Sequence, residues 1–357
     1  MRTLVIEKAL VKQNIAVIKD KAHGAVIYGM LSGDGGGAGT VPLAHLLRDE
    51  GITHFAVHEV EEAQALREAG FVEEEILMLR STTDRELLEK LVDLNVVCTV
   101  SSVDTGMALN ALAENRSTVV EAHIQVDTGM GFGGFLVSEP EKILLAYRSL
   151  PNVALTGIYT QLHGTAPRGL EASAQLEQFQ QVLEAIHAAG FETGIVHAAG
   201  SYALLHYDFA RMDGVRAGSA LLGRCRRSED DGLVKVGYGL APLTEVRWLP
   251  KGHTVGSGRS VTLKRATRVA VLPVGYLNGF GVAERPWDND TLWGVLRRWR
   301  RDRKRTVRIG GQKVKIIGSI GAVETVLNVT NLKCSVGDLV SFDIDPLYAQ
   351  GFRREYR

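Results

Sequence analysis

Short apolar runs alternate with helix-like patterns from residue 25 to about residue 220. Each run has the length of a buried strand, and the segments between them, such as Ala172–Ala189, carry apolar residues at helical spacing. Crossover helices of this kind connect parallel strands, so the pattern predicts an α/β fold with a parallel sheet. The runs are Ala25–Leu31, His54–Val57, Ile76–Leu79, Val96–Val100, Val119–Val126, Ala154–Leu162, Gly194–Ala198 and Gly214–Ala217.

The number of strands favours one of two parallel folds. Eight strands with crossover helices are typical of a (β/α)8 TIM barrel, which we expect over residues 8–225. An open, doubly wound sheet is the alternative, but no Gly-x-Gly-x-x-Gly motif follows the first strand. We therefore favour the barrel.

The pattern changes near residue 225, where short strands separated by Gly, Asp and Asn turns begin. This pattern predicts an antiparallel β domain over residues 226–357, to which residues 1–7 add a strand. The expected strands are Val234–Arg247, Thr254–Ala266, Val269–Val274, Val307–Ile309, Lys313–Ile317, Thr325–Val329 and Leu339–Ile344.

Residues 288–306 interrupt the β pattern with a segment rich in arginine and tryptophan. We interpret it as a helical, basic insertion that is solvated or contributes to a dimer contact. Nucleic-acid binding through the basic residues 297–305 with Trp293 or Trp299 is the alternative. No other feature of the chain supports that alternative.

Composition narrows the function classes. The 357 residues include 41 basic and 41 acidic side chains, and this balance argues against dedicated binding of nucleic acid or a membrane surface. No apolar stretch is long enough to span a membrane, and the N-terminus lacks the apolar core of a signal peptide. The three cysteines are far apart without metal-ligand spacing, so we expect reduced core thiols in a cytoplasmic protein.

Seven segments occur in the order and at the places expected of one known family. They are spread from residue 126 to residue 343, and with them the chain resembles the alanine racemases, the fold-type III pyridoxal-phosphate enzymes. The resemblance implies a TIM barrel followed by a C-terminal antiparallel β domain, and a homodimer in which the partner's β domain completes each barrel mouth. The segments are VDTGMGFGGF (126–135), TGIYTQLHGTA (156–166), VHAAGSYALL (196–205), DGVRAGSALLGR (213–224), LPVGYLNGFGV (272–282), IGSIGAVETVLNVT (317–330) and VGDLVSFD (336–343).

The family's cofactor chemistry implies residues that this chain lacks. In the family, a lysine at the end of the first strand forms the Schiff base with pyridoxal phosphate. Gly37 and Gly39 fix the register of LSGDGGGAG (31–39), which puts Ser32 at the lysine position and Gly36 at a tyrosine position. Ser257 takes the place of the tyrosine that the partner's β domain contributes. Serine cannot form an imine, so we expect no covalent cofactor, and pyridoxal phosphate would bind only as a non-covalent ligand.

Five further ligand positions have changed toward small or uncharged side chains. Where the family has lysine, arginine, histidine, asparagine and methionine, this chain has Gln125, Phe132, Gln161, Gly200 and Ala322. The resemblance therefore implies a pocket that has lost positive charge and gained space. We infer that it accepts a larger or less anionic ligand.

Other positions match the family. Arg216 matches the arginine that faces the cofactor's pyridine nitrogen. Ser201, Gly218 and Ser219 match parts of the phosphate-binding site, which strand ends and helix N-termini form in barrels. His197 lies on the seventh strand, where the family often has a histidine for structural reasons.

Several side chains are candidates for catalysis: Ser32, Tyr28, Asp127, His163, Ser257 and Tyr276. Asp127 is more typical of a turn acceptor, and Tyr28, inside a strand, is more typical of the core. His123, His163 and His197 could bind a metal at the barrel mouth, but two of them match structural histidines, so we expect no metal site. The glycines of residues 33–39 could bind phosphate, but the lysine and Ser/Thr of a P-loop are missing.

Three functions stay open. The chain is a repurposed member that binds or transforms another small molecule in the barrel mouth, a non-catalytic dimeric scaffold or regulator, or a pyridoxal-phosphate-dependent alanine or amino-acid racemase. The coordinated loss of the catalytic groups favours the first. Without an imine, the α-proton of alanine is too weakly acidic for Ser32 or Ser257 to remove, which argues against the third.

Overall fold

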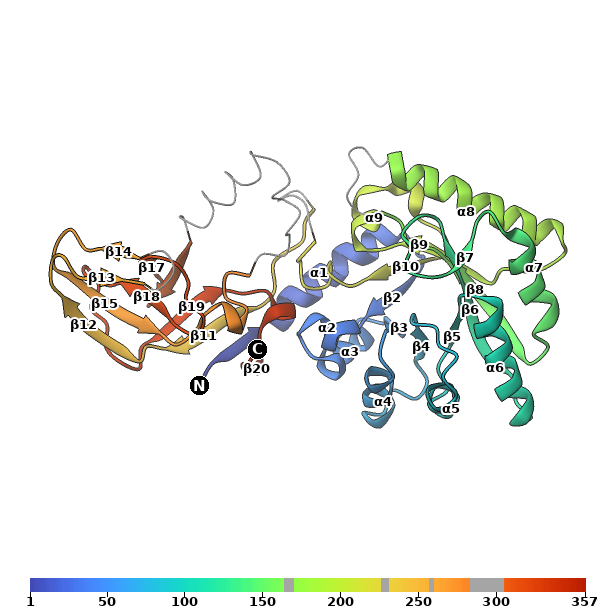
Figure 1. Cartoon of the computed structure of the whole chain (residues 1–357), viewed down its shortest axis with the longest axis horizontal. Helices are drawn as coiled ribbons and strands as arrows, with labels where there is room; N and C mark the ends of the chain where they lie inside the picture. The colour runs from blue at the N-terminus through green and yellow to red at the C-terminus, as the bar shows by residue number, and fades with distance from the viewer. Residues whose placement is uncertain (164–169, 226–230, 257–259, 283–304) are drawn as a thin grey trace. The chain divides into compact units, whose positions relative to one another are not determined.

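The computed structural model describes residues 1–163, 170–225, 231–256, 260–282 and 305–357 (Figure 1). The chain forms two compact units, one of Ala9–Lys235 and one of Met1–Lys8 with Val236–Arg357. The first unit reaches Lys235, whereas the sequence led us to expect the barrel to end at residue 225. Ser257 and residues 288–304 of the expected basic insertion lie outside the described residues.

The first unit contains a parallel eight-stranded barrel. Its strands follow the order β4-β3-β2-β10-β9-β8-β6-β5, and the short strand β7 (Phe135–Leu136) pairs with β6. A parallel bridge between Leu77 and Val97 joins the two ends of this order, so the barrel is nearly closed. The predicted barrel is thereby confirmed, and the open doubly wound sheet is wrong. The strands are β2 (Val26–Met30), β3 (His54–Val57), β4 (Glu75–Met78), β5 (Cys98–Val100), β6 (Val120–Asp127), β8 (Val153–Tyr159), β9 (Ile195–Ala199) and β10 (Gly214–Ala217).

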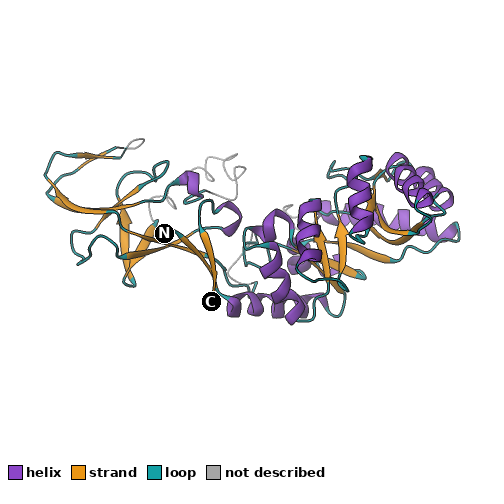
Figure 2. Ribbon diagram, turned by 90° about the horizontal axis from the view of Figure 1, so that it is seen from below, coloured by secondary structure: helices purple, strands orange, loops and turns teal. Residues whose placement is uncertain are grey.

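Helices surround the barrel strands, as Figures 1 and 2 show. Their starts follow local signals: the Asp84 carboxylate accepts a hydrogen bond from the amide of Leu87 at α5, and Ser102 forms a capping box at α6. Each longer helix buries an apolar face against the strands, which anchors the strand ends that carry the candidate site. The helices are α1 (Lys8–Ala22), α2 (Ser32–Gly36), α3 (Thr40–Asp49), α4 (Val60–Glu68), α5 (Arg85–Asp93), α6 (Val103–Asn115), α7 (Pro140–Ser149), α8 (Leu170–Ala188), α9 (Ser201–His206) and the 3-10 turn η2 (Asp208–Ala210).

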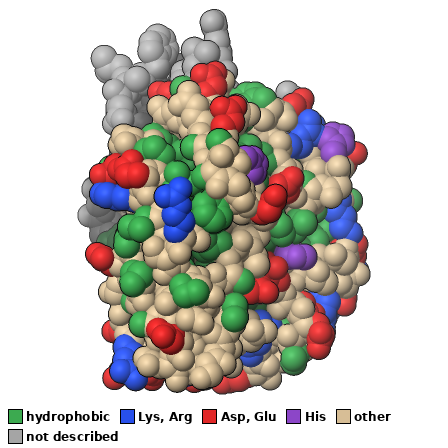
Figure 3. Space-filling view, turned by 90° about the vertical axis from the view of Figure 1, so that its right-hand side faces the viewer, with side chains coloured by type: hydrophobic (Ala, Val, Ile, Leu, Met, Phe, Trp, Pro, Cys, Tyr) green, Lys and Arg blue, Asp and Glu red, His purple; other side chains and the backbone are tan. Residues whose placement is uncertain are grey.

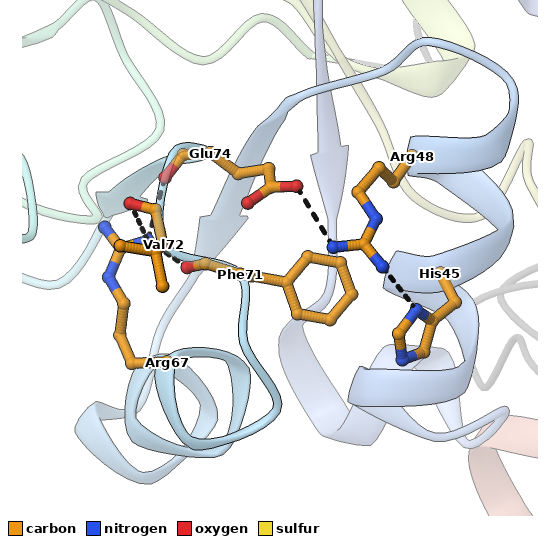
Figure 4. Close-up of polar contacts among 6 residues, drawn as sticks. All are labelled: His45, Arg48, Arg67, Phe71, Val72 and Glu74. Atoms are coloured by element: carbon orange, nitrogen blue, oxygen red, sulfur yellow. Dashed lines mark hydrogen bonds and ion pairs between the residues drawn. The ribbon is translucent and has the colours of Figure 1, made fainter.

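Arginine side chains stabilise the amino end of β4 (Figure 4). Arg67 donates to backbone carbonyls of the loops 71–74 and 94–95, and Arg48 contacts the carboxylate of Glu74. A cavity of about 320 Å³ lies beside Arg67, among the first residues of β4 and β6. Catalytic groups of parallel barrels come from the opposite, carboxyl ends of the strands, so we assign these contacts to the stability of the fold.

The second unit contains a nine-stranded sheet in the order β12-β15-β18-β17-β16-β19-β11-β1-β20. The sheet is antiparallel except for the parallel pair of β1 and β20, which confirms the predicted β domain. The segment Val234–Arg247, expected as one strand, forms two, because β11 ends at a proline, which cannot donate to a ladder. The strands are β1 (Thr3–Ile6), β11 (Tyr238–Pro242), β12 (Glu245–Leu249), β15 (Thr267–Leu272), β16 (Thr306–Ile309), β17 (Gln312–Ile316), β18 (Thr325–Asn328), β19 (Leu339–Asp343) and β20 (Arg353–Tyr356), with a separate hairpin of β13 (Thr254–Val255) and β14 (Val261–Thr262) and the 3-10 turns η3 (Tyr276–Asn278) and η5 (Pro346–Tyr348).

A helix that crosses a membrane needs about 20 predominantly apolar residues. None of the helices among the described residues is both long and apolar enough to cross a bilayer. Figure 3 shows acidic, basic and apolar side chains interspersed over one face, without a large area of one charge.

Candidate functional site at the barrel mouth

The carboxyl ends of β2 and β3 place a serine and a histidine side by side. Ser32 follows β2 after one residue, His58 follows β3 directly, and Ser32 Oγ lies 2.6 Å from His58 Nδ1. The two strands are parallel neighbours, so their carboxyl ends meet although the residues are far apart in sequence. Burial lowers the pKa of His58 below its ordinary value, so the imidazole is neutral near neutral pH and can accept the serine hydroxyl proton.

Glu62 links the loops that carry this pair. Its Oε2 accepts hydrogen bonds from the backbone amides of His58 and Glu59, and its Oε1 accepts one from the amide of Asp34. Glu62 and Glu59 also form the capping box that starts α4. One carboxylate therefore fixes the backbone beside both members of the pair.

The residues of α2 after Ser32 have a left-handed conformation, so this segment is a loop and not a regular α-helix. Residues 33–37 all have positive φ, from 55° at Asp34 to 83° at Gly37. Glycine adopts this conformation without steric cost, and aspartate tolerates it. Gly36 has φ of 62°, and a Cβ added there would lie 3.3 Å from Leu222 Cδ1. A tyrosine at position 36 would therefore be strained in this loop conformation.

Arg216 is buried inside the barrel and engages several acceptors. Nη2 donates to the carbonyls of Thr160 at 2.6 Å and Ala198 at 3.3 Å and to Gln161 Oε1 at 2.8 Å, and Nη1 donates to His197 Nδ1 at 2.6 Å. Burial lowers the pKa of Arg216 to about 10, so the guanidinium is still charged at neutral pH. Three of the residues expected in the ligand site, Arg216, Gln161 and His197, are thus in direct contact.

His197 lies between two tyrosine rings. It stacks on Tyr28 and on Tyr159, with ring centroids 5.0 Å apart in each case. Because Arg216 can only donate, Nδ1 of His197 accepts, which leaves the proton on Nε2 to donate to His123 Nδ1 at 3.0 Å. Burial lowers the pKa of both imidazoles, that of His123 to about 3, so both are neutral.

Two catalytic candidates make contacts typical of structural residues. Tyr28 is fully buried, and its hydroxyl donates to Glu75 Oε1 at 2.9 Å; burial is the main cause that raises its pKa. Asp127 Oδ1 accepts from the backbone amides of residues 129–131 at 2.8, 2.9 and 3.1 Å. These contacts agree with the core position and the turn acceptor that the sequence favoured.

The expected ligand residues on the other loops are more dispersed. Gln125 Nε2 lies 3.5 Å from the carbonyl of Phe132, whose side chain is 76% exposed. A Cβ added at Gly200 would lie 3.2 Å from Gln161 Nε2, so the glycine leaves room for the glutamine. These positions line the loops around Arg216 without contacting the Ser32–His58 pair among the hydrogen bonds of the described residues.

The expected phosphate-binding residues form hydrogen bonds within the protein. Ser201 Oγ accepts from the amides of Gly218 at 2.9 Å and Ala220 at 3.3 Å. Ser219 Oγ lies 3.1 Å from Cys225 Sγ. Cys225 is only half-buried, which corrects the expectation that all three cysteines are core residues.

Three candidate residues remain, His163, Tyr276 and Ala322, and none of them takes part in the hydrogen bonds described above. The backbone amide of His163 donates to Gln175 Oε1 at 2.7 Å. Tyr276 and Ala322 belong to the second unit, where Tyr276 is 53% exposed. Within the part of the chain that the structure describes, no group of three or more His, Cys, Asp or Glu side chains could hold a metal ion.

Two family models together match most of the chain. The alanine racemase N-terminal domain matches residues 6–225, and the alanine racemase C-terminal domain matches residues 240–343. The chain belongs to the alanine racemase family. An alanine racemase of Clostridium novyi (strain NT) is 28% identical over 329 residues, which cover 90% of this chain and 79% of the relative. One of Carboxydothermus hydrogenoformans is 32% identical over 275 residues, which cover 76% of this chain and 74% of the relative.

Solved alanine racemase structures share the fold of this family member. The protein from Clostridium difficile 630 gives a TM-score of 0.83 at 22% identity, covering 99% of this chain and 95% of that one. The protein from Bartonella henselae, solved with covalently bound pyridoxal phosphate, gives 0.82 at 21% identity, covering 100% and 99%. At these identities the similarity establishes the fold only. The chemistry of this family member has to be inferred from its own residues.

Sequence reasoning missed two residues of the candidate site, His58 and Glu62. A signal was present, because His58 directly follows a predicted strand and therefore lies at the carboxyl end of the barrel. Glu59 and Glu62 are spaced as an N-cap and N3 residue, which would have located the start of the next helix. Consecutive strands of such a barrel are neighbours, so these signals place His58 beside the end of the strand that precedes Ser32.

Proposed function

We propose that this family member does not use the Schiff-base chemistry of pyridoxal phosphate and instead binds or transforms another small molecule at the barrel mouth. The contact between Ser32 and His58 carries this proposal. In the register set by Gly37 and Gly39, the family lysine would stand at Ser32, and a hydroxyl cannot form an imine. The residue present there does not fit a covalently bound cofactor.

Two other features support the proposal. The left-handed loop at Gly36 disfavours the tyrosine that the family resemblance implies there. Arg216 donates to backbone carbonyls, His197 and Gln161, so its guanidinium is satisfied by the protein without a cofactor nitrogen.

The decisive experiment adds pyridoxal phosphate to the purified protein and records the visible spectrum before and after borohydride, followed by the intact mass. We expect no imine band and no added mass. A reduced adduct on the natural protein would refute the proposal, because another lysine would then anchor the cofactor. Ser32→Lys is the matched variant: an adduct at position 32 would verify the register.

A racemisation assay and a ligand screen separate the other two functions. L-alanine incubated with the protein and added cofactor should keep its configuration; racemisation would favour the racemase. A specific metabolite that raises Tm would support a working pocket, since a ligand that binds the folded state stabilises it. A broad screen without any shift would favour the dimeric scaffold or regulator.

We also propose that the protein is a cytoplasmic homodimer, as the family resemblance implies. Three apolar side chains on the second unit, Tyr276, Leu277 and Val323, are between 51% and 59% exposed. Backbone bonds from residues 276 and 277 to 321 and 322 hold these segments together. Leu277→Asp should shift sedimentation toward the monomer, whereas Val261→Asp, another exposed position of the same unit, should not.

A further inference from the structure

We propose that Ser32 and His58 are a nucleophile and its general base, and that this pair hydrolyses a small carboxylic ester at the barrel mouth. The inference rests on the proposed function, because a lysine-bound cofactor would use the same strand end. The reacting atom is Ser32 Oγ, the base is His58 Nδ1, and the substrate is a small carboxylic ester.

The geometry of the pair is that of an activated serine. Ser32 Oγ lies 2.6 Å from His58 Nδ1, within the reach that a nucleophile and its base require. Ser32 is only partly buried, so a small substrate can approach the hydroxyl. It also follows β2 by one residue, at the carboxyl end of the barrel, where parallel barrels place their catalytic groups.

A second pair of side chains, after strands β4 and β5 of the same barrel, can be compared with Ser32 and His58. Ser81 Oγ and Ser101 Oγ lie 2.5 Å apart at the ends of β4 and β5. That pair joins two hydroxyls and contains no base, so neither serine is activated. Ser32 differs because its partner is an imidazole that burial keeps neutral and able to take a proton.

Charged groups around the imidazole set its proton affinity. Burial is the largest influence on the pKa of His58 and lowers it; Arg80 and Arg216 lower it further, while Glu62 and Glu59 raise it. Glu62 also holds the amides of His58 and Asp34, so it is a positioning residue. The net result is a base that is unprotonated near neutral pH, as proton abstraction from Ser32 requires.

The proposed reaction consumes one ester and one water. Ser32 Oγ attacks the ester carbonyl carbon while His58 Nδ1 accepts the hydroxyl proton. The carbon–oxygen bond to the alcohol then breaks, and His58 returns the proton to the departing alcohol oxygen. Water attacks the acyl-serine, gives a proton to His58, and the acid leaves as that proton returns to Ser32 Oγ. The products are one carboxylic acid and one alcohol, with no oxidation or reduction.

The test exposes the full-length protein to a small alkyl fluorophosphonate, which modifies activated serines with loss of fluoride. We expect a single adduct by intact mass, located on Ser32 by peptide mapping. Ser32→Ala should abolish it, and Ser101→Ala, the matched serine without a base, should retain it. His58→Gln should slow labelling by about 100-fold, the usual contribution of a general base. An unlabelled natural protein, or a label on another residue, would overturn the inference.

The pH profile of labelling separates catalysis from a structural hydrogen bond. The rate should fall as the pH drops through the pKa of His58, which lies below the ordinary value of 6.5. Glu62→Gln removes a charge that raises this pKa, so the midpoint should move to lower pH. A profile that does not change below pH 6.5, or is the same in both proteins, contradicts the role of His58.

The outcomes for the two proposals are distinguishable. A reduced pyridoxal-phosphate adduct refutes the proposed function, whatever happens with the fluorophosphonate. A protein that takes neither reagent keeps the proposed function and loses the nucleophile–base pair. A fluorophosphonate adduct on Ser32 without a pyridoxal-phosphate adduct supports both.

Discussion

Acid should destabilise the barrel because it encloses neutral histidines. Burial, with Arg216 and His54 nearby, lowers the pKa of His123 to about 3, and burial lowers that of His197 in the same direction. In the unfolded chain a histidine binds its proton near pH 6.5. The unfolded state therefore binds more protons than the folded state between about pH 3 and 6.5. The contribution of these histidines to the free energy of unfolding is fully present above about pH 6.5 and is lost as the pH falls toward about 3.

The magnitude follows from the shift at His123. At about pH 5 the unfolded histidine is protonated and the folded one is still neutral. The difference of about 1.5 pH units from 6.5, at about 1.36 kcal/mol per unit, removes about 2 kcal/mol of folding free energy relative to pH 7.5. His197 contributes a further loss of the same sign.

Urea unfolding at about pH 7.5 and about pH 5, followed by far-ultraviolet circular dichroism, measures this loss. The signal reports on the barrel, because the described α-helices, apart from the first residue of α1, belong to that unit. His123→Gln should lose about 2 kcal/mol less than the natural protein over the same interval. His187→Gln, an exposed histidine on α8, should behave as the natural protein does. Equal losses in His123→Gln and the natural protein would refute the reasoning.

Three further substitutions test other contacts. Arg216→Met should lower the free energy of unfolding by about 3–5 kcal/mol in urea, because buried carbonyls left unpaired cost about 1–3 kcal/mol each; a loss below 1 kcal/mol would contradict this. Asp127→Ala should speed amide hydrogen exchange at residues 129–131, which lose their acceptor, and unchanged exchange would count against the anchoring role. Gly134→Ala should lower Tm more than Gly131→Ala, since a Cβ at 134 meets backbone at 2.8 Å whereas 131 faces open space; equal shifts would disprove it.

The fold was predictable because it depends on periodic patterns. The eight barrel strands are apolar runs that end close to their predicted residues, as with His54–Val57 and Gly214–Ala217. The last strand, Arg353–Tyr356, was missed because it is polar and largely exposed at the edge of the sheet, without the alternation that marks a half-buried strand. Pairing with β1 creates this strand, and pairing of segments so distant in sequence leaves no local pattern.

The candidate site was only partly predictable. Arg216, Gln161 and His197 were chosen by resemblance, and Arg216 does contact both of the others. The resemblance could not show that Arg216 donates hydrogen bonds to backbone carbonyls. Every residue has a backbone carbonyl, so the sequence does not indicate which of them accept. It also could not show that Glu62 accepts hydrogen bonds from the loops after β2 and β3. Those contacts depend on the distance between the ends of the two strands in the folded barrel.

The pair at the barrel mouth shows why a missing catalytic residue is an incomplete guide to function. Resemblance marks Ser32 only as a position where a lysine is absent. His58 lies in none of the segments that carry the resemblance, so its importance is shown only by its 2.6 Å contact with Ser32, at the ends of the neighbouring strands β2 and β3. Parallel barrels bring the residue after each strand to one shared mouth, so a substitution at one strand end acquires its chemistry from its neighbours. Ser81 contacts another hydroxyl, which cannot act as its base, whereas Ser32 contacts a neutral imidazole and is therefore a candidate nucleophile.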